Sequence, residues 1–147
     1  MRLRGARTTG VAVAVGAVVA AGCGGEEGPT QEEFAQQANA ICERHTAPIR
    51  EAAGRLLAGG ELPDPREFMQ LTRETIIPEL TAQVNELRQL EAPEAQSEEF
   101  QRFVESSAAA RERIAQDPRA LTNPSNFEQV NQQAQQLGLS QCRVGPG

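Results

Sequence analysis

Large apolar side chains are scarce in this sequence, and their scarcity limits what the chain can fold into. From Cys23 to Gly147 only 24 of 125 residues are Leu, Ile, Val or Phe, and the chain has no Trp and no Tyr. A content below roughly 20% is typical of strongly charged chains that stay unfolded, because they bury too little apolar surface to offset conformational entropy. The composition therefore predicts a thin core that needs regular helical packing or a covalent cross-link.

The N-terminal segment has the layout of an export signal. Residues 1–7 carry three arginines, residues 11–21 are an unbroken stretch of Val, Ala and Gly, and Gly22 and Cys23 follow. This order of charged, apolar and small residues is typical of a removable leader. The apolar stretch is about half of the ~20 residues that a membrane-spanning helix requires. We therefore expect residues 1–22 to be a signal peptide.

The end of this leader resembles a bacterial lipobox. The run is Ala20, Ala21, Gly22 and Cys23, with Ala20 where Leu is usual. The resemblance implies that Cys23 is diacylated and becomes the first residue of the mature protein, which is then anchored on the extracytoplasmic face of the cell membrane. Two acyl chains give stable anchoring. The alternative is an ordinary secretory leader cut near Ala21 or Gly22. Residues 23–30, rich in Gly and Glu, are expected to form a flexible tether.

The two remaining cysteines, Cys42 and Cys142, form an even pair in an exported chain. Disulfides form and persist in oxidising compartments, so we expect these two residues to be joined. The alternative is a metal site in which Cys42 and His45 form a C-x-x-H half. No second His and no nearby Cys completes such a site.

Apolar residues recur at spacings of three and four along four stretches of the chain, which predicts four amphipathic helices. The stretches run over residues 34–57, 68–90, 100–114 and 127–137. Helix starts and stops flank them, with Asp64, Ser97 and Asn123 as starts and Gly60, Pro93, Asp117 and Gly138 as stops.

We therefore predict an all-α domain over residues 31–147, an antiparallel up-down bundle of about four helices stapled by one disulfide. An even number of helices returns the chain to the end where it started. Cys42 and Cys142 can therefore meet.

Two prolines interrupt the predicted helices. Pro48 and Pro78 each remove a backbone donor and favour a kink, and the two kinks fall at similar heights in an antiparallel pair. One interpretation is that the kinks curve the helices around a small core, with His45 half-buried and hydrogen-bonded. The other is a polar cleft that binds a small ligand. Its candidate contacts are His45, Thr46, Glu74 and Thr75.

The residue inventory argues against an enzyme. His45 is the only histidine and has no identifiable partners for nucleophilic catalysis. Glu32–Glu33 and Glu98–Glu99 are helix neighbours whose side chains point apart. A haem held by His45 and Met69 is conceivable from residue types, but both are expected to be packing residues. We expect no catalytic residue, no metal and no cofactor, and the acidic exported chain is a poor nucleic-acid binder.

Three short runs together resemble the small, uncharacterised helical lipoproteins of high-GC actinobacteria. They are Asn39-Ala40-Ile41-Cys42, the Leu-x-x-Leu-x-x-Pro run from Leu87 to Pro93, and Leu137-Gly138-Leu139-Ser140-Gln141-Cys142. The resemblance implies an exported helical domain with paired cysteines and carries over no functional residue.

Two functions remain after these exclusions. The first is a non-catalytic interaction or structural module that meets an envelope protein or a glycan. Five glutamines in the last helical stretch offer an uncharged polar surface for it: Gln129, Gln132, Gln133, Gln135 and Gln136. The alternative is a small-ligand-binding lipoprotein that uses the cleft between the kinked helices.

Overall fold

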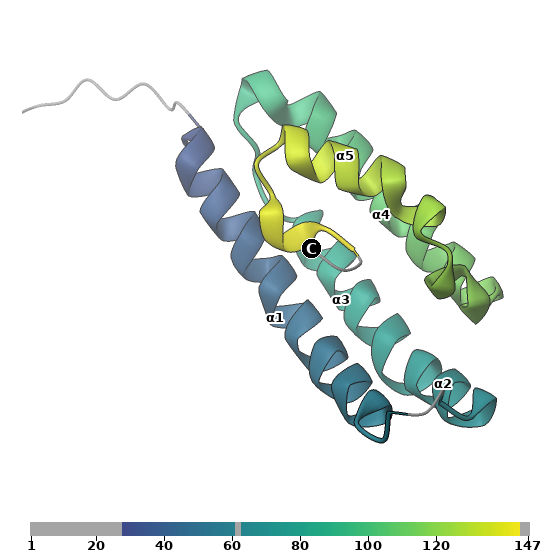
Figure 1. The fold of residues 1–147 in the computed structure, drawn as a ribbon. Coiled ribbons are helices and arrows are strands. Elements are labelled where there is room, and N and C mark those ends of the chain that lie inside the picture. Colours follow the sequence, from purple (N-terminus) through teal and green to yellow (C-terminus); the bar gives the residue numbers. More distant parts are fainter. Residues whose placement is uncertain (1–27, 61–62, 145–147) are drawn as a thin grey trace, which may run out of the picture.

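The computed structural model describes residues 28–60 and 63–144. The predicted signal peptide (1–22), Cys23 and most of the tether lie outside these residues. Within them the chain is all-α and forms an antiparallel up-down bundle, which confirms the predicted fold class (Figure 1). The α-helices are α1 (Gln31–Leu57), α2 (Pro65–Leu71), α3 (Ile77–Leu87), α4 (Ser97–Gln116) and α5 (Glu128–Gln136). Short 3₁₀ turns occur at Glu94–Gln96, Pro118–Thr122, Pro124–Phe127 and Ser140–Cys142.

Local side-chain chemistry sets the helix starts. The Thr30 hydroxyl accepts the backbone N–H of Glu33 at 3.3 Å, and the Glu33 carboxylate accepts the backbone N–H of Thr30 at 3.0 Å. This reciprocal capping box lowers the pKa of Glu33, chiefly through the bond from the Thr30 backbone. Asp64 accepts from the N–H of Arg66 at 2.7 Å and starts α2, as predicted.

The last helix stops at the predicted glycine. Gly138 has a φ of 73°, a left-handed conformation that glycine adopts without strain. The N–H of Leu139 donates to the carbonyl of Ala134 at 2.7 Å, and that of Gly138 donates to the carbonyl of Gln135 at 3.1 Å. This pair of bonds is a Schellman motif. It turns the chain back toward α1 for the disulfide.

The second helical stretch accommodates Pro78 through a π-helical turn at Thr72–Ile76 that links α2 to α3. The N–H of Ile77 donates to the carbonyl of Thr72, five residues back instead of four. Such a turn contains one extra residue, so the side chains before and after it face different directions. The sequence predicted a kink at Pro78 but did not predict the π-helical turn. Pro48 lies within the continuous helix α1.

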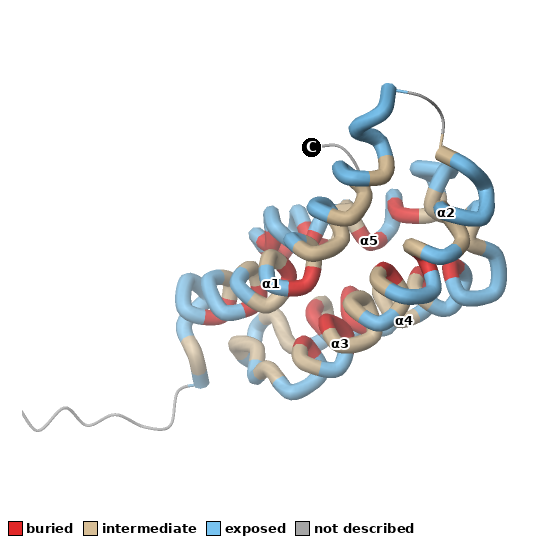
Figure 2. Tube along the Cα trace, turned by 90° about the horizontal axis from the view of Figure 1, so that it is seen from below, coloured by how far each residue is buried: buried red, intermediate tan, exposed pale blue. Residues whose placement is uncertain are grey.

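The core lies where the first half of α1 faces α3, α4 and α5. Phe34 is fully buried and packs edge-to-face on Phe100, with ring centroids 4.8 Å apart. In Figure 2 the buried residues gather along these four helices, and α2 is drawn in tan and blue because it buries none. Around Phe34 the core contains Ala38, Cys42, Val84, Leu87, Phe103, Val104, Ile114, Phe127, Val130, Leu137 and Leu139.

The prediction of one buried face along the whole first helix is wrong beyond His45. Ile49 and Leu56 are half-buried, and Leu57 is 56% exposed. The reason is what lies opposite each part of α1, which has 27 residues and spans about 40 Å. Helix α1 packs chiefly on α3 and on the last 3₁₀ turn, and much less on α2 and the π-helical turn. We call residues 49–57 of α1 together with α2 the distal hairpin; they form the lower end of Figure 1.

Candidate functional site

A buried disulfide joins Cys42 of α1 to Cys142 in the last 3₁₀ turn. The two Cα atoms are 5.0 Å apart, and the residues are separated by 100 positions. This confirms the predicted pair and overturns the metal half-site, because Cys42 is not free to bind a metal. Asn39 holds the same segment: its side chain donates to the carbonyl of Gly138 at 3.2 Å and accepts the N–H of Gln141 at 2.9 Å.

The only histidine lies between two carboxylates of α3. His45 Nδ1 is 2.8 Å from Glu79 Oε2, and Nε2 is 3.0 Å from Glu86 Oε1. The His45 side chain is 9% exposed. An imidazolium satisfies both contacts with its two N–H groups, whereas a neutral imidazole donates to one of them. His45 is thus a polar cross-link between α1 and α3, as one of the two interpretations of the kinked helices expects.

This cross-link perturbs Glu86. The hydrogen bond with His45 lowers the pKa of the Glu86 carboxyl below its usual 4.5; burial opposes this effect, and the charge of Arg44 adds to it. Arg44 Nη1 forms an ion pair with Glu86 Oε2 on the outer side. The carboxylate of Glu86 is therefore held by the His45 ring and the Arg44 guanidinium, both from α1.

The Glu86→Gln substitution is expected to destabilise the protein more at neutral pH than at acidic pH. A carboxyl whose pKa is lowered on folding stabilises the fold above its unfolded pKa, and this contribution disappears as the pH falls through the folded pKa. The measurement is the urea midpoint of wild type and variant from neutral pH down to about pH 3. Glu33 also has a lowered pKa, but it is unchanged in both proteins. A difference in midpoint that does not vary with pH would contradict the assignment.

The structure does not bring the four predicted ligand contacts together. His45 faces Glu79 and Glu86, while Thr46 donates its hydroxyl to the carbonyl of Cys42 at 2.9 Å and lines a cavity beside the disulfide. Glu74 is exposed and accepts a hydrogen bond from Gln70 at 3.0 Å. Thr75 is half-buried. Glu74 and Thr75 lie in the π-helical turn, whose extra residue changes which side chains face α1.

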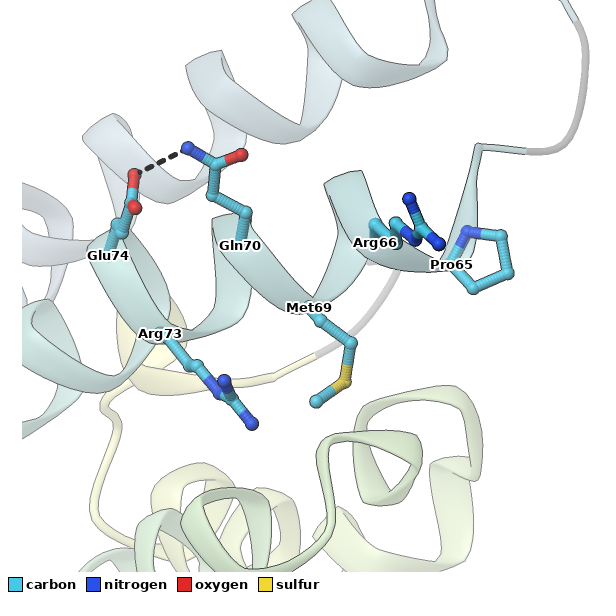
Figure 3. A pocket seen from close by; sticks show the side chains of 6 residues that line it. All are labelled: Pro65, Arg66, Met69, Gln70, Arg73 and Glu74. Atoms are coloured by element: carbon cyan, nitrogen blue, oxygen red, sulfur yellow. Dashed lines mark hydrogen bonds between the residues drawn. The ribbon is translucent and has the colours of Figure 1, made fainter.

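The first helical turns of α2 and the π-helical turn carry an open hollow of about 540 Å³ that the sequence did not predict. Figure 3 shows Met69 and Arg73 pointing to one side of it, and Gln70 and Glu74 joined on the other. Arg66 and Arg73 form no salt bridge with the residues that the structure describes. Its six lining residues are Pro65, Arg66, Met69, Gln70, Arg73 and Glu74.

The spacing Arg66, Met69, Arg73 places two cations and one apolar side chain along one face of a helix. We call these three residues the basic stripe. Met69 lies on this surface, whereas both ring nitrogens of His45 contact carboxylates, so the two residues do not form a common haem site.

The described residues also answer two geometric questions. None of their helices is both long and apolar enough to cross a membrane. Over residues 28–60 and 63–144, no three or more His, Cys, Asp or Glu side chains are grouped so that they could hold a metal ion.

Comparisons of the chain with models of protein families, with curated proteins and with solved structures find no match.

Proposed function

We propose that this protein is a membrane-anchored, extracytoplasmic lipoprotein that acts without catalysis, as an interaction module of the cell envelope. The observation that carries the proposal is the distal hairpin, whose helix α2 packs chiefly on the adjoining π-helical turn and on α1 and presents the basic stripe to solvent. If α2 served only to stabilise the bundle, the side chains of α2 would be buried, but α2 has no buried residue. The leader and Cys23 supply the membrane anchor of the proposal.

The position of the anchor supports a role for the distal hairpin. Cys23 lies five residues before Gly28, so the chain between them reaches at most about 17 Å. The first turn of α1 is therefore held near the membrane when Cys23 is lipidated. The distal hairpin is at the other end of α1, about 40 Å away. It is the end of α1 farthest from the proposed anchor.

The chemistry of the basic stripe favours a protein partner. Arg66 and Arg73 present guanidinium groups that bind carboxylates in a bidentate manner. Met69 between them is flexible and apolar, and such side chains adapt to apolar partners. We therefore propose a partner segment in which carboxylates flank an apolar side chain. A glycan would use the arginines and leave Met69 without a role.

The Cys23→Ser variant is expected to leave the membrane fraction, because it removes the thiol that carries the acyl chains. The wild-type protein is expected to remain with the membranes after high-salt washing, since two acyl chains anchor stably. Fractionation with immunoblotting measures both, and mass spectrometry reads the mature N-terminus. Cys23→Ser in the membrane fraction, or an unmodified wild-type N-terminus, would overturn the anchor.

A photo-cross-linking residue at Met69 is expected to yield one defined protein adduct in intact cells. The matched control is the same residue at Arg102, which is exposed on α4 and outside the hollow. The double substitution Arg66→Glu and Arg73→Glu should abolish the Met69 adduct, because it places two carboxylates opposite those of the partner. Mass spectrometry of the adduct should locate the link in an acidic segment. Equal labelling from both positions, an adduct that survives the charge reversal, or a glycan adduct would refute this interface.

A further inference from the structure

A cavity of about 320 Å³ lies beside the buried disulfide, at the point where the distal hairpin leaves the bundle. Cavities of about 300 to 1,000 Å³ are the size of small-molecule sites. Its walls combine segments that are far apart in the sequence: α1, the π-helical turn, α3, the 3₁₀ turn after α4, and the C-terminal segment. The apolar side chains in the walls are Ile49, Ile76, Leu80, Leu121 and Val144.

One polar side chain of this cavity lacks a partner. Gln83 is 8% exposed and lines the cavity. Its Nε2 donates to Cys42 Sγ at 3.0 Å, but its buried Oε1 accepts no hydrogen bond from the described part of the chain. That oxygen has almost no accessible surface, so Gln83 closes the inner wall of the cavity and its oxygen is out of reach of a bound molecule.

The rim of the cavity carries two arginines. Arg50 is held by Glu43, with Nη2 and Oε1 2.6 Å apart. Arg143 is exposed and forms no salt bridge with any residue that the structure describes. Arg143 is thus available to an anionic group at the rim.

We propose that this cavity binds a small amphipathic carboxylate. The apolar body of the ligand lies among the Ile and Leu side chains, and its carboxylate contacts Arg143. The site is separate from the basic stripe. A negative cross-linking result at Met69 would therefore not contradict ligand binding in the cavity. A negative titration would not contradict the interface at the basic stripe.

Titration of the mature protein, with its disulfide intact, tests the site. The probe is para-hydroxyphenylpropionate, followed by amide chemical shifts in NMR spectra. We expect saturable shifts centred on Ile49, Leu80 and Leu121. Tyramine, which has an ammonium group in place of the carboxylate, should not bind.

Two variants separate the contacts. Arg143→Gln should weaken binding of para-hydroxyphenylpropionate about tenfold, whereas Arg102→Gln, an exposed arginine on α4 that lies outside this cavity, should leave the affinity unchanged. Arg143 is exposed, so its substitution leaves the core of the bundle unchanged. Absence of saturable shifts, shifts centred elsewhere, equal binding of the two probes, or wild-type affinity in Arg143→Gln would overturn the proposal.

Discussion

Loss of the disulfide between Cys42 and Cys142 is expected to remove up to roughly 4.7 kcal/mol of unfolding free energy, the value that the chain-entropy model gives for a loop of about 100 residues. A small domain has a total stability of about 5 to 15 kcal/mol. The effect is therefore large enough to leave the reduced chain partly unfolded at physiological temperature. The physical cause is that the cross-link restricts the unfolded chain, which otherwise samples far more conformations.

The measurement is urea unfolding, followed by far-ultraviolet circular dichroism, of oxidised wild type, reduced wild type and the double variant Cys42→Ala with Cys142→Ala. Both cysteines are buried, so alanine avoids placing a hydroxyl in the core. The reduced and alanine forms should unfold at similar urea concentrations, well below that of the oxidised form. An oxidised protein that unfolds at the same urea concentration as the reduced protein would show that helical packing alone sustains the fold.

Phe34→Ala is expected to destabilise the protein by about 3 to 5 kcal/mol, the range for removal of a buried aromatic side chain. Phe34 is fully buried and loses its edge-to-face contact with Phe100. Phe68→Ala removes the same atoms from α2, where the side chain is half-buried. Its effect should be less than about half as large, because less apolar surface returns to water and the surroundings can close around the gap.

The comparison of these two variants tests where the core lies, and chemical unfolding measures both. The residue type and the substitution are the same, so the difference reports position alone. Equal losses would show that the distal hairpin has a core of its own and would contradict the description of α2 as a segment free to meet a partner. Far-ultraviolet spectra of both variants check that the helices are retained.

Local chemistry explains why much of the secondary structure could be predicted. Asp64 and Gly138 act within one helical turn of their own positions, so their roles at helix ends are visible in the sequence. The π-helical turn at Thr72–Ile76 gave no comparable signal, because its extra residue depends on how Pro78 is accommodated in the packed bundle. The Thr30–Glu33 capping box was visible as T-x-x-E and was overlooked.

The candidate sites were harder to predict because they depend on register between helices. His45 and its carboxylate partners Glu79 and Glu86 are separated by 34 and 41 positions. The vertical offset and the rotation of α3 relative to α1 decide which carboxylates of α3 face His45. Glu74 was expected near His45 because the kinks at Pro48 and Pro78 fall at similar heights, but the π-helical turn at Thr72–Ile76 changes which side chains of this segment face α1.

By itself, the sequence determined the helical class of the domain, the positions of most helix ends and the pairing of Cys42 with Cys142, because periodicity, capping and an even cysteine count are properties of the chain. Only the tertiary structure decided which half of α1 is buried and where Gln83 and Arg143 come together around a cavity. Burial depends on what lies opposite each turn. Helix α3 and the 3₁₀ turn that carries Cys142 pack on α1, whereas α2 packs chiefly on the adjoining π-helical turn and buries no residue.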